Sequence, residues 1–366
     1  MEIVKKIFKA AGRIFLGIMI ILLLALVGLF IYHRIHTSKN KEFLKEMGYY
    51  NPVSVGDHSL NLVEYDGAKD KHRIVALGGN GWGFPLELRE LADELREEGA
   101  VYYPARAGYD GSDDVKQDMT VEFVVEDYRK VLRNAGVEAP YILMPHSYAG
   151  VLATYWVNKY PDEIEAMIDL DGIIAQSFTE EQLQEAMEQT KGMATIRGVM
   201  NLGIGDVALH VFFPKDPDYS EDEQHIYDAM TLMTSGSAAF VSDIGCVAVN
   251  TDKTWKIMQP NDVPKLYISS SNGYRTVEEL EADDVLSEYR IAALTEGFEG
   301  SDEERRAKAY EMEFAEISEY RKEKMQPYIE KLGNCELVDL PGSHFIHLEK
   351  PHECAEIIKD FIGGLN

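Results

Sequence analysis

Short apolar runs alternate with amphipathic stretches along most of the chain. An apolar run of a few residues bounded by turn residues is typical of a buried strand, and apolar residues at helical spacing indicate a helix. The pattern predicts strands at 73–77, 101–103, 141–144, 166–171, 264–269 and 335–340, and helices at 86–98, 120–134, 151–160 and 351–362. This alternation predicts an α/β fold with a mostly parallel central sheet and helices on both faces.

Two segments interrupt the alternation. Residues 175–262 look helical with glycine interruptions, and they carry an apolar set of Met187, Met193, Met200, Met230, Met233, Phe212, Phe213 and Phe240. Methionine adapts to varied shapes, so this segment fits a helical lid over a binding cleft, and it fits equally an accessory domain with its own core. The second segment, 273–333, is strongly charged. Ser301 and Glu304 predict a capping box at the start of a long helix that Pro327 disturbs.

The N-terminal segment 1–45 has a different pattern. Residues 14–32 form an uncharged apolar run of 19 residues, which is long enough to cross the hydrocarbon layer as a helix. A signal peptide has a shorter apolar region and a small-residue cleavage site, and residues 32–36 offer no such site. We therefore expect an uncleaved transmembrane helix, a polar linker around 33–50, and a single-pass membrane protein.

This division gives four predicted units. They are the anchor and linker at 1–45, the first part of the α/β core at 46–174, the helical lid at 175–262, and the second part of the core at 263–366 with the charged insertion 273–333.

The distribution of charge bears on orientation and partners. Four Lys or Arg residues precede the apolar run and four follow it, so the positive-inside count is nearly tied. A short tail with four positive charges crosses a membrane poorly, which favours a cytoplasmic N-terminus and an extracytoplasmic folded domain. The 321 residues after the anchor have a formal balance of −33, so nucleic acid is a poor partner. A solvated acidic surface explains this charge better than recognition of a cationic substrate.

The cysteines do not suggest a metal site. Cys246, Cys335 and Cys354 are too few and too scattered for a disulfide framework or a ligand set. We expect no metal and no cofactor, and the sequence gives no oligomeric state.

Ser147 is the candidate nucleophile, because it stands just past the apolar run 141–144, after Pro145 and His146. A serine hydroxyl attacks an acyl carbon only when it is held out from the backbone, near a base and near donors for the oxyanion. A sharp strand-to-helix turn of the form G-x-S-x-G does this. Here the flanking positions hold Pro145 and Ala149; the alanine is small enough, whereas the proline departs from the pattern.

Four motifs in order resemble the α/β-hydrolase superfamily, from about residue 60 to the C-terminus apart from the two insertions. Residues 77–81 are similar to the loop after the third strand, and residues 106–112 to the R-x-G-x-G-x-S loop after the fourth. Residues 144–150 fall where the nucleophile elbow belongs, and residues 340–351 look like the loop of the catalytic histidine. The resemblance implies an α/β-hydrolase fold with a helical lid.

The resemblance also implies roles. Ser147 would be the nucleophile and His344 the base, since neutral imidazole suits proton transfer near neutrality. The backbone N–H groups of Asn80 and Tyr148 would form the oxyanion hole. His347 is then a packing or surface histidine, and His146 packs under the elbow.

The orienting acid is less directly indicated. In most of the family it follows the strand that here ends at 269–273, yet no carboxylate occurs there before Glu278. A minority, including some haloalkane dehalogenases, carry it at the end of the preceding strand, which selects Asp171. Asp169 points to the same face of an extended strand and stays an alternative. A third possibility is that Asn272 orients the histidine.

The expected function is a serine hydrolase that cleaves an ester or amide bond of a small molecule through an acyl-enzyme, more like a carboxylesterase or lipase than a peptidase. The alternatives are a proline-iminopeptidase-like peptidase and a non-catalytic binding protein of the same fold, to which Pro145 and the displaced acid point. A dehalogenase or epoxide hydrolase is disfavoured, because those members use aspartate where this chain has Ser147.

Overall fold

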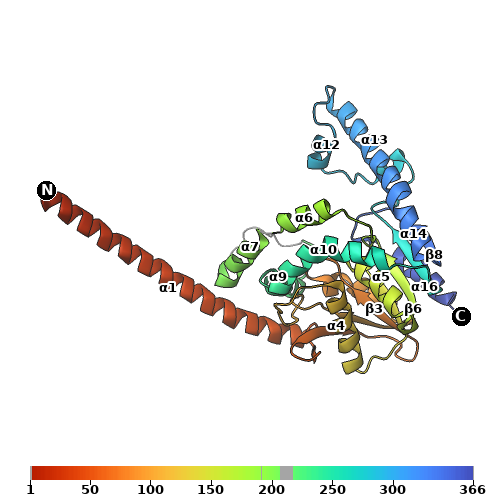
Figure 1. Ribbon diagram of the computed structural model, residues 1–366, viewed down its shortest axis with the longest axis horizontal. Coiled ribbons are helices and arrows are strands. Elements are labelled where there is room, and N and C mark those ends of the chain that lie inside the picture. Colours follow the sequence, from red (N-terminus) through yellow and green to blue (C-terminus); the bar gives the residue numbers. More distant parts are fainter. Residues whose placement is uncertain (1, 191, 207–216, 366) are drawn as a thin grey trace.

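The computed structural model describes residues 2–190, 192–206 and 217–365, and its centre is one twisted sheet (Figure 1). The described strands are β1 (Pro52–Ser54), β2 (Ser59–Tyr65), β3 (His72–Leu77), β4 (Gly99–Pro104), β5 (Tyr141–Pro145), β6 (Ile164–Leu170), β7 (Lys265–Ser269) and β8 (Cys335–Asp339). Their order in the sheet is β1-β2-β4-β3-β5-β6-β7-β8. The β1–β2 and β2–β4 pairs are antiparallel, and the other pairs are parallel. The predicted α/β class and all six predicted strands are confirmed; β1 and β2 are additional.

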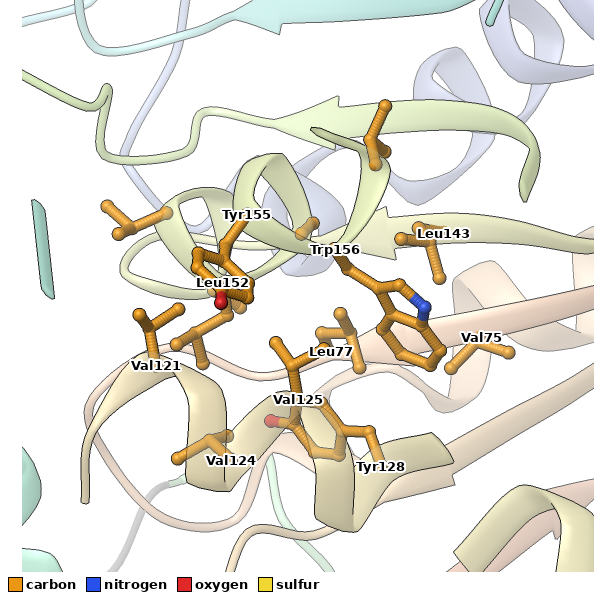
Figure 2. Packing of buried hydrophobic residues seen from close by; sticks show 14 of the residues in the cluster. Val75, Leu77, Val121, Val124, Val125, Tyr128, Leu143, Leu152, Tyr155 and Trp156 are labelled. Carbon is orange, nitrogen blue, oxygen red and sulfur yellow. The ribbon is translucent and has the colours of Figure 1, made fainter. Parts of the chain in front are cut away.

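Each face of the sheet is covered by helices. Along β3, Val75 and Leu77 belong to one buried cluster and Ile74 and Ala76 to the other, as the period of two in a strand requires. Figure 2 shows the first cluster, in which side chains of α4 (Val121–Asn134) and α5 (Ala149–Lys159) meet the sheet. Trp156 of α5 is completely buried there, and truncating such a side chain costs about 3–5 kcal/mol. On the other face, α3 (Arg89–Glu94) and α16 (Pro351–Gly363) pack together.

The helix predicted at 86–98 is shorter and broken. The structure has α2 (Phe84–Glu87), then α3, which ends before the strand β4 begins. β4 begins at Gly99, where a Cβ would lie 2.3 Å from the carbonyl oxygen of His72 on the neighbouring strand. Residues 95–98, predicted as the end of the helix, form the turn that leads from α3 into β4.

The N-terminal helix α1 (Glu2–Glu46) is longer than the predicted membrane span. It is long and apolar enough to cross a membrane, its most apolar window is fully exposed, and its N-terminal part extends away from the rest of the molecule (Figure 1). The linker expected around 33–50 is helical as far as Glu46. Residues 33–46 contain no glycine or proline, and Leu44 is buried against α9 (Glu221–Ser235) in a small apolar cluster.

The segment predicted as a lid is helical where it is described. It contains α6 (Glu180–Gln189), α7 (Met193–Val199), the π-helical turn η2 (Met200–Ile204), α9 and α10 (Ala238–Ile257). Phe212 and Phe213 lie outside the described residues. Met230 is buried in the cluster with Leu44, whereas Met187 is 55% exposed, so the methionines do not form one common core.

The charged insertion is helical, and its part up to Ile317 has a separate apolar cluster, whereas Met325, Tyr328 and Leu332 pack into the main core. It contains α11 (Val277–Ala282), α12 (Glu288–Leu294), α13 (Asp302–Tyr320), the π-helical turn η3 (Arg321–Met325) and α14 (Gln326–Leu332). The structure has the capping box of Ser301 and Glu304 at the start of α13. Pro327 stands in the first turn of α14, directly after η3, so the disturbance expected there is present. Beyond β8 the chain forms the short α15 (Ile346–Glu349) and then α16.

Candidate active site

Ser147 stands at a strained turn between β5 and α5. Its φ is 56°, in the left-handed region that non-glycine residues rarely adopt and that costs roughly 1–2 kcal/mol. Such strain is concentrated at functional sites, where the surrounding structure enforces it. Pro145 is the last residue of β5 and pairs with Leu77, so it occupies a strand position and the sharp turn forms after it.

His344 is bound to Asp171. Its Nδ1–H donates to Asp171 Oδ2 at 2.8 Å, and the same carboxylate accepts from the Ser270 backbone N–H at 2.7 Å and the Ser271 hydroxyl at 2.6 Å. Three donors hold this buried carboxylate in one orientation. Because Nδ1 carries the hydrogen, Nε2 of a neutral His344 is unprotonated, which is the tautomer that a general base needs.

The two alternative partners of His344 lie elsewhere. Asp169 accepts from the Gly172 N–H at 2.7 Å, and burial raises the pKa of its carboxyl well above its ordinary value. The side chain of Asn272 donates to Ser271 Oγ. β6 ends at Leu170 and Asp171 has a φ of 50°, so the strand rule that placed both aspartates on one face does not apply at Asp171. Of the three candidates, the structure brings Asp171 to His344.

The two proposed oxyanion donors flank the serine. Asn80 lies in the loop after β3, and Tyr148 follows Ser147 at the start of α5. Within the described part of the chain, neither backbone N–H donates a hydrogen bond to a protein acceptor. Both are therefore available for an oxygen of a bound substrate.

Ser147 and His344 open onto one cavity of about 300 Å³. Its walls are mainly aromatic, from Trp82, Phe84, Tyr227, Phe240 and Phe345. Two larger hollows, of about 560 and 670 Å³, lie away from Ser147 and are lined largely by charged and polar residues. We take the smaller one as the candidate site because it contains the reactive groups, and its volume suits a small ligand. Two of its wall residues, Tyr227 and Phe240, come from α9 and α10 of the predicted lid.

A buried ion pair joins α10 to Arg106 in the loop after β4, and Arg106 in turn contacts the loop after β3. Arg106 Nε lies 3.0 Å from Asp243 Oδ2 of α10, and both side chains are almost completely buried. The Arg106 guanidinium also donates to the carbonyl oxygens of Gly78 and Gly79, each at 2.7 Å. It thereby fixes the backbone that leads to Asn80. In the sequence, Arg106 was recognised only as part of a motif, and Asp243 was not identified. Asp243 is the one carboxylate in the apolar stretch 238–250, and this isolation could have indicated a buried charge.

Two further histidines pack behind His344. His146 Nε2–H donates to the His344 carbonyl oxygen at 2.8 Å, which holds the loop that carries His344. Burial lowers the pKa of His146 well below its ordinary value, and the neighbouring His347 and His344 add to this effect. His347 is completely buried, which makes it a packing residue and not a surface one, and burial lowers its pKa to about 3.

A carboxyl group that the sequence analysis did not identify lies beside this cluster. Glu87 of α2 lines the cavity, and its carboxylate is 3.8 Å from His347 Nε2. Burial raises the pKa of Glu87 to about 7. Across residues 2–190, 192–206 and 217–365, no group of three or more His, Cys, Asp or Glu side chains is arranged to hold a metal ion.

Comparisons of the sequence with known proteins do not show a family for this chain. No protein-family model matches the chain. The uncharacterized protein YbdG of Bacillus subtilis is 28% identical over 276 residues, which are 73% of this chain and 82% of that protein.

Solved structures are similar in fold at low sequence identity. The haloalkane dehalogenase DatA of Agrobacterium tumefaciens is 12% identical with a TM-score of 0.56, covering 86% of this chain and 96% of its own. Cfl2 of Burkholderia cenocepacia is 17% identical with a TM-score of 0.58, covering 86% and 95%. The epoxide hydrolase CorEH is 17% identical with a TM-score of 0.55, covering 87% and 99%.

Proposed function

Because this chain is an α/β-hydrolase-fold protein, we propose that it is a serine hydrolase that cleaves an ester or amide bond through an acyl-enzyme. One observation carries the proposal. The strained Ser147 shares a cavity with His344, whose Nδ1–H is donated to Asp171 at 2.8 Å. A serine nucleophile, a histidine base and a carboxylate that orients the imidazole are the three groups that Ser-His-Asp hydrolases use for acyl transfer.

The reaction uses these groups in two steps. Ser147 Oγ attacks the acyl carbon while His344 Nε2 takes the hydroxyl proton, and the N–H groups of Asn80 and Tyr148 bind the oxyanion. His344 then gives the proton to the leaving alcohol or amine as its bond to the acyl carbon breaks. A water molecule, activated by the same nitrogen, releases the acid and restores Ser147. Asp171 orients the imidazole and stabilises its protonated form.

The identity of the nucleophile separates this activity from those named for the similar structures. Dehalogenases and epoxide hydrolases of this fold use an aspartate where this chain has Ser147. The side chain available here forms an acyl ester, which water can hydrolyse. The aromatic walls of the cavity favour an apolar acyl group, so the proposed activity is that of a carboxylesterase or lipase-like enzyme.

One observation favours a second candidate, a proline-iminopeptidase-like peptidase. The carboxyl group of Glu87 lies in the cavity wall, where it would attract the ammonium group of an N-terminal residue. Burial raises the pKa of Glu87 to about 7. A positively charged ammonium group bound beside it would lower this pKa and favour the carboxylate form.

The cellular arrangement is also a proposal. α1 anchors the protein as a single-pass membrane protein with its N-terminus in the cytoplasm and the hydrolase domain outside it.

A fluorophosphonate probe tests the activity. It should label the full-length protein in detergent micelles, and Ser147→Ala should abolish labelling while the melting temperature is retained. An unlabelled wild-type protein, or equal labelling of Ser147→Ala, would refute the serine hydrolase and favour the non-catalytic binding protein. A panel of p-nitrophenyl esters of increasing chain length, run beside N-terminal proline arylamides, then separates esterase from peptidase.

A further inference from the structure

The π-helical turn η2 packs directly against α1. Gly203 has a φ of 83°, and a Cβ at this position would lie 2.4 Å from the Leu29 carbonyl oxygen and 3.3 Å from His33 Cβ. Only glycine permits so close an approach of the two backbones. η2 is therefore fitted to this one place on α1.

A second contact fixes the same segment. Asp206 accepts a hydrogen bond from His33 Nδ1 and another from His36 Nδ1, each at 2.7 Å, and its carboxylate is buried. The two histidines are on one face of α1, a single turn apart. The segment that contains η2 is thus tied to α1 by a backbone contact at Leu29 and by side chains just beyond it.

This attachment places η2 at a defined height along α1. The apolar run of α1 ends at Tyr32, so Leu29 and His33 stand at its boundary. A helix rises about 1.5 Å per residue, so Gly203 lies within roughly one turn of the end of the run. When that run spans a bilayer, η2 must lie at the surface of the membrane.

The adjoining residues have the chemistry of a membrane surface. Ile196 is 63% exposed, and Val199 and Leu202 are each 40% exposed, at helical spacing along α7 and η2. Arg197 is the one charged residue between Met193 and Ile204, in a chain whose net charge is −27. An exposed apolar face with little charge is costly in water and stable at the boundary of headgroups and acyl chains.

We propose that α7 and η2 form a second membrane contact, in which Ile196, Val199 and Leu202 insert into the leaflet on the side of the folded domain. The partner of this apolar face is the bilayer, because the contacts of η2 with α1 hold the face at the level where the apolar run of α1 ends. The inference rests on the proposed anchor and is independent of the hydrolase activity.

Depth-dependent quenching tests the contact. The full-length chain, with its three native cysteines replaced by alanine, is reconstituted into phosphatidylcholine vesicles at low protein density. A thiol-reactive NBD fluorophore is attached at Ile196→Cys. Lipids with a doxyl group near the headgroup should quench it at least twofold more than the same label at Tyr289→Cys, a position 86% exposed on α12.

A label at Leu22→Cys, in the middle of the apolar run, separates the proposed transmembrane anchor from the proposed surface contact. Quenching at Leu22 by deep doxyl groups without quenching at Ile196 would leave the anchor standing and overturn the surface contact. Lack of quenching at both positions would overturn both. A blue-shifted Ile196 label that doxyl lipids do not quench would mean that protein, such as a second copy, covers the face, and this too would refute the proposal.

Discussion

Gly79 and Ser147 are in direct contact across the candidate site. A Cβ on residue 79 would lie 2.5 Å from Ser147 Cβ and 3.0 Å from Ser147 Oγ, distances that side chains do not tolerate. The loop after β3 can therefore approach the nucleophile only with glycine at this position. That approach brings Asn80 to the proposed oxyanion hole.

Gly79→Ala should lower kcat/KM by at least about 100-fold, because it displaces a donor that acts in the transition state. Gly81→Ala is the matched control, since a Cβ at residue 81 meets no atom within 4 Å. Ester hydrolysis and melting temperature are measured for both. A Gly79→Ala enzyme as active as Gly81→Ala would contradict the assignment.

Asp171→Asn should reduce the rate of acyl transfer by about 10³- to 10⁴-fold, because the amide cannot stabilise the protonated imidazole and favours the wrong tautomer. Asp169→Asn is the comparison, and it should cost less than tenfold. Asp169 accepts from the Gly172 N–H, and the oxygen of an asparagine amide can accept the same hydrogen bond. Single-turnover acylation by the fluorophosphonate measures both variants; equal loss in the two would remove Asp171 from its role.

Asp243→Asn should destabilise the fold by about 3–5 kcal/mol, because it leaves the buried Arg106 without its counter-charge. Activity should fall as well, since Arg106 holds the carbonyls of Gly78 and Gly79. Lys253→Gln, on the same helix, breaks only a partly exposed pair with Glu122 and should cost less than about 1 kcal/mol. Guanidinium unfolding in detergent measures the difference, and similar costs for the two variants would contradict a stabilising role of the pair between Asp243 and Arg106.

Glu87→Gln should change how stability depends on pH. Burial raises the pKa of Glu87 in the folded protein to about 7, from an ordinary value of 4.5. Between these values the folded state binds more protons than the unfolded state, so this group's contribution is complete below about pH 4.5 and is lost as pH rises through 7. A glutamine at this position stays neutral, so its contribution to stability does not change with pH.

The variant should therefore gain on the order of 1–3 kcal/mol relative to wild type between pH 4.5 and pH 8. Melting temperatures of both proteins at half-unit pH steps give this difference. A difference that stays constant across the range would show that Glu87 titrates normally.

Much of the fold could be predicted from the sequence, because the patterns that indicate strands, helices and the turn at Ser147 are local. Strands such as 141–144 are short apolar runs, and Ser147 follows one of them at a turn whose spacing has a known form. The helical span of α1 was equally visible in its composition. In each case neighbouring residues along the chain determine the structure.

The features that could not be predicted from the sequence depend on contacts between residues that are far apart along the chain. The helix α1 continues to Glu46, where α9, nearly 200 residues away in the chain, covers Leu44. Asp243 has meaning only beside Arg106, and Glu87 acquires its raised pKa only after burial near His347. The choice between Asp169 and Asp171 depended on the end of β6, which falls one residue before the turn at Asp171.

The packing of α9 has a consequence for the position of the candidate cavity. His225 of α9 stacks on Phe43 of α1 at 4.1 Å, while Tyr227, two residues on, lines the cavity of Ser147. Leu44 lies 12 residues beyond Tyr32, so the unbroken helix holds this wall about 18 Å from the end of the apolar run. A folded domain held by a continuous helix at a fixed distance from the apolar run cannot rotate freely relative to that run. Once α1 spans a bilayer, the rate at which the cavity meets molecules that diffuse within the membrane depends on their number per unit area of the leaflet.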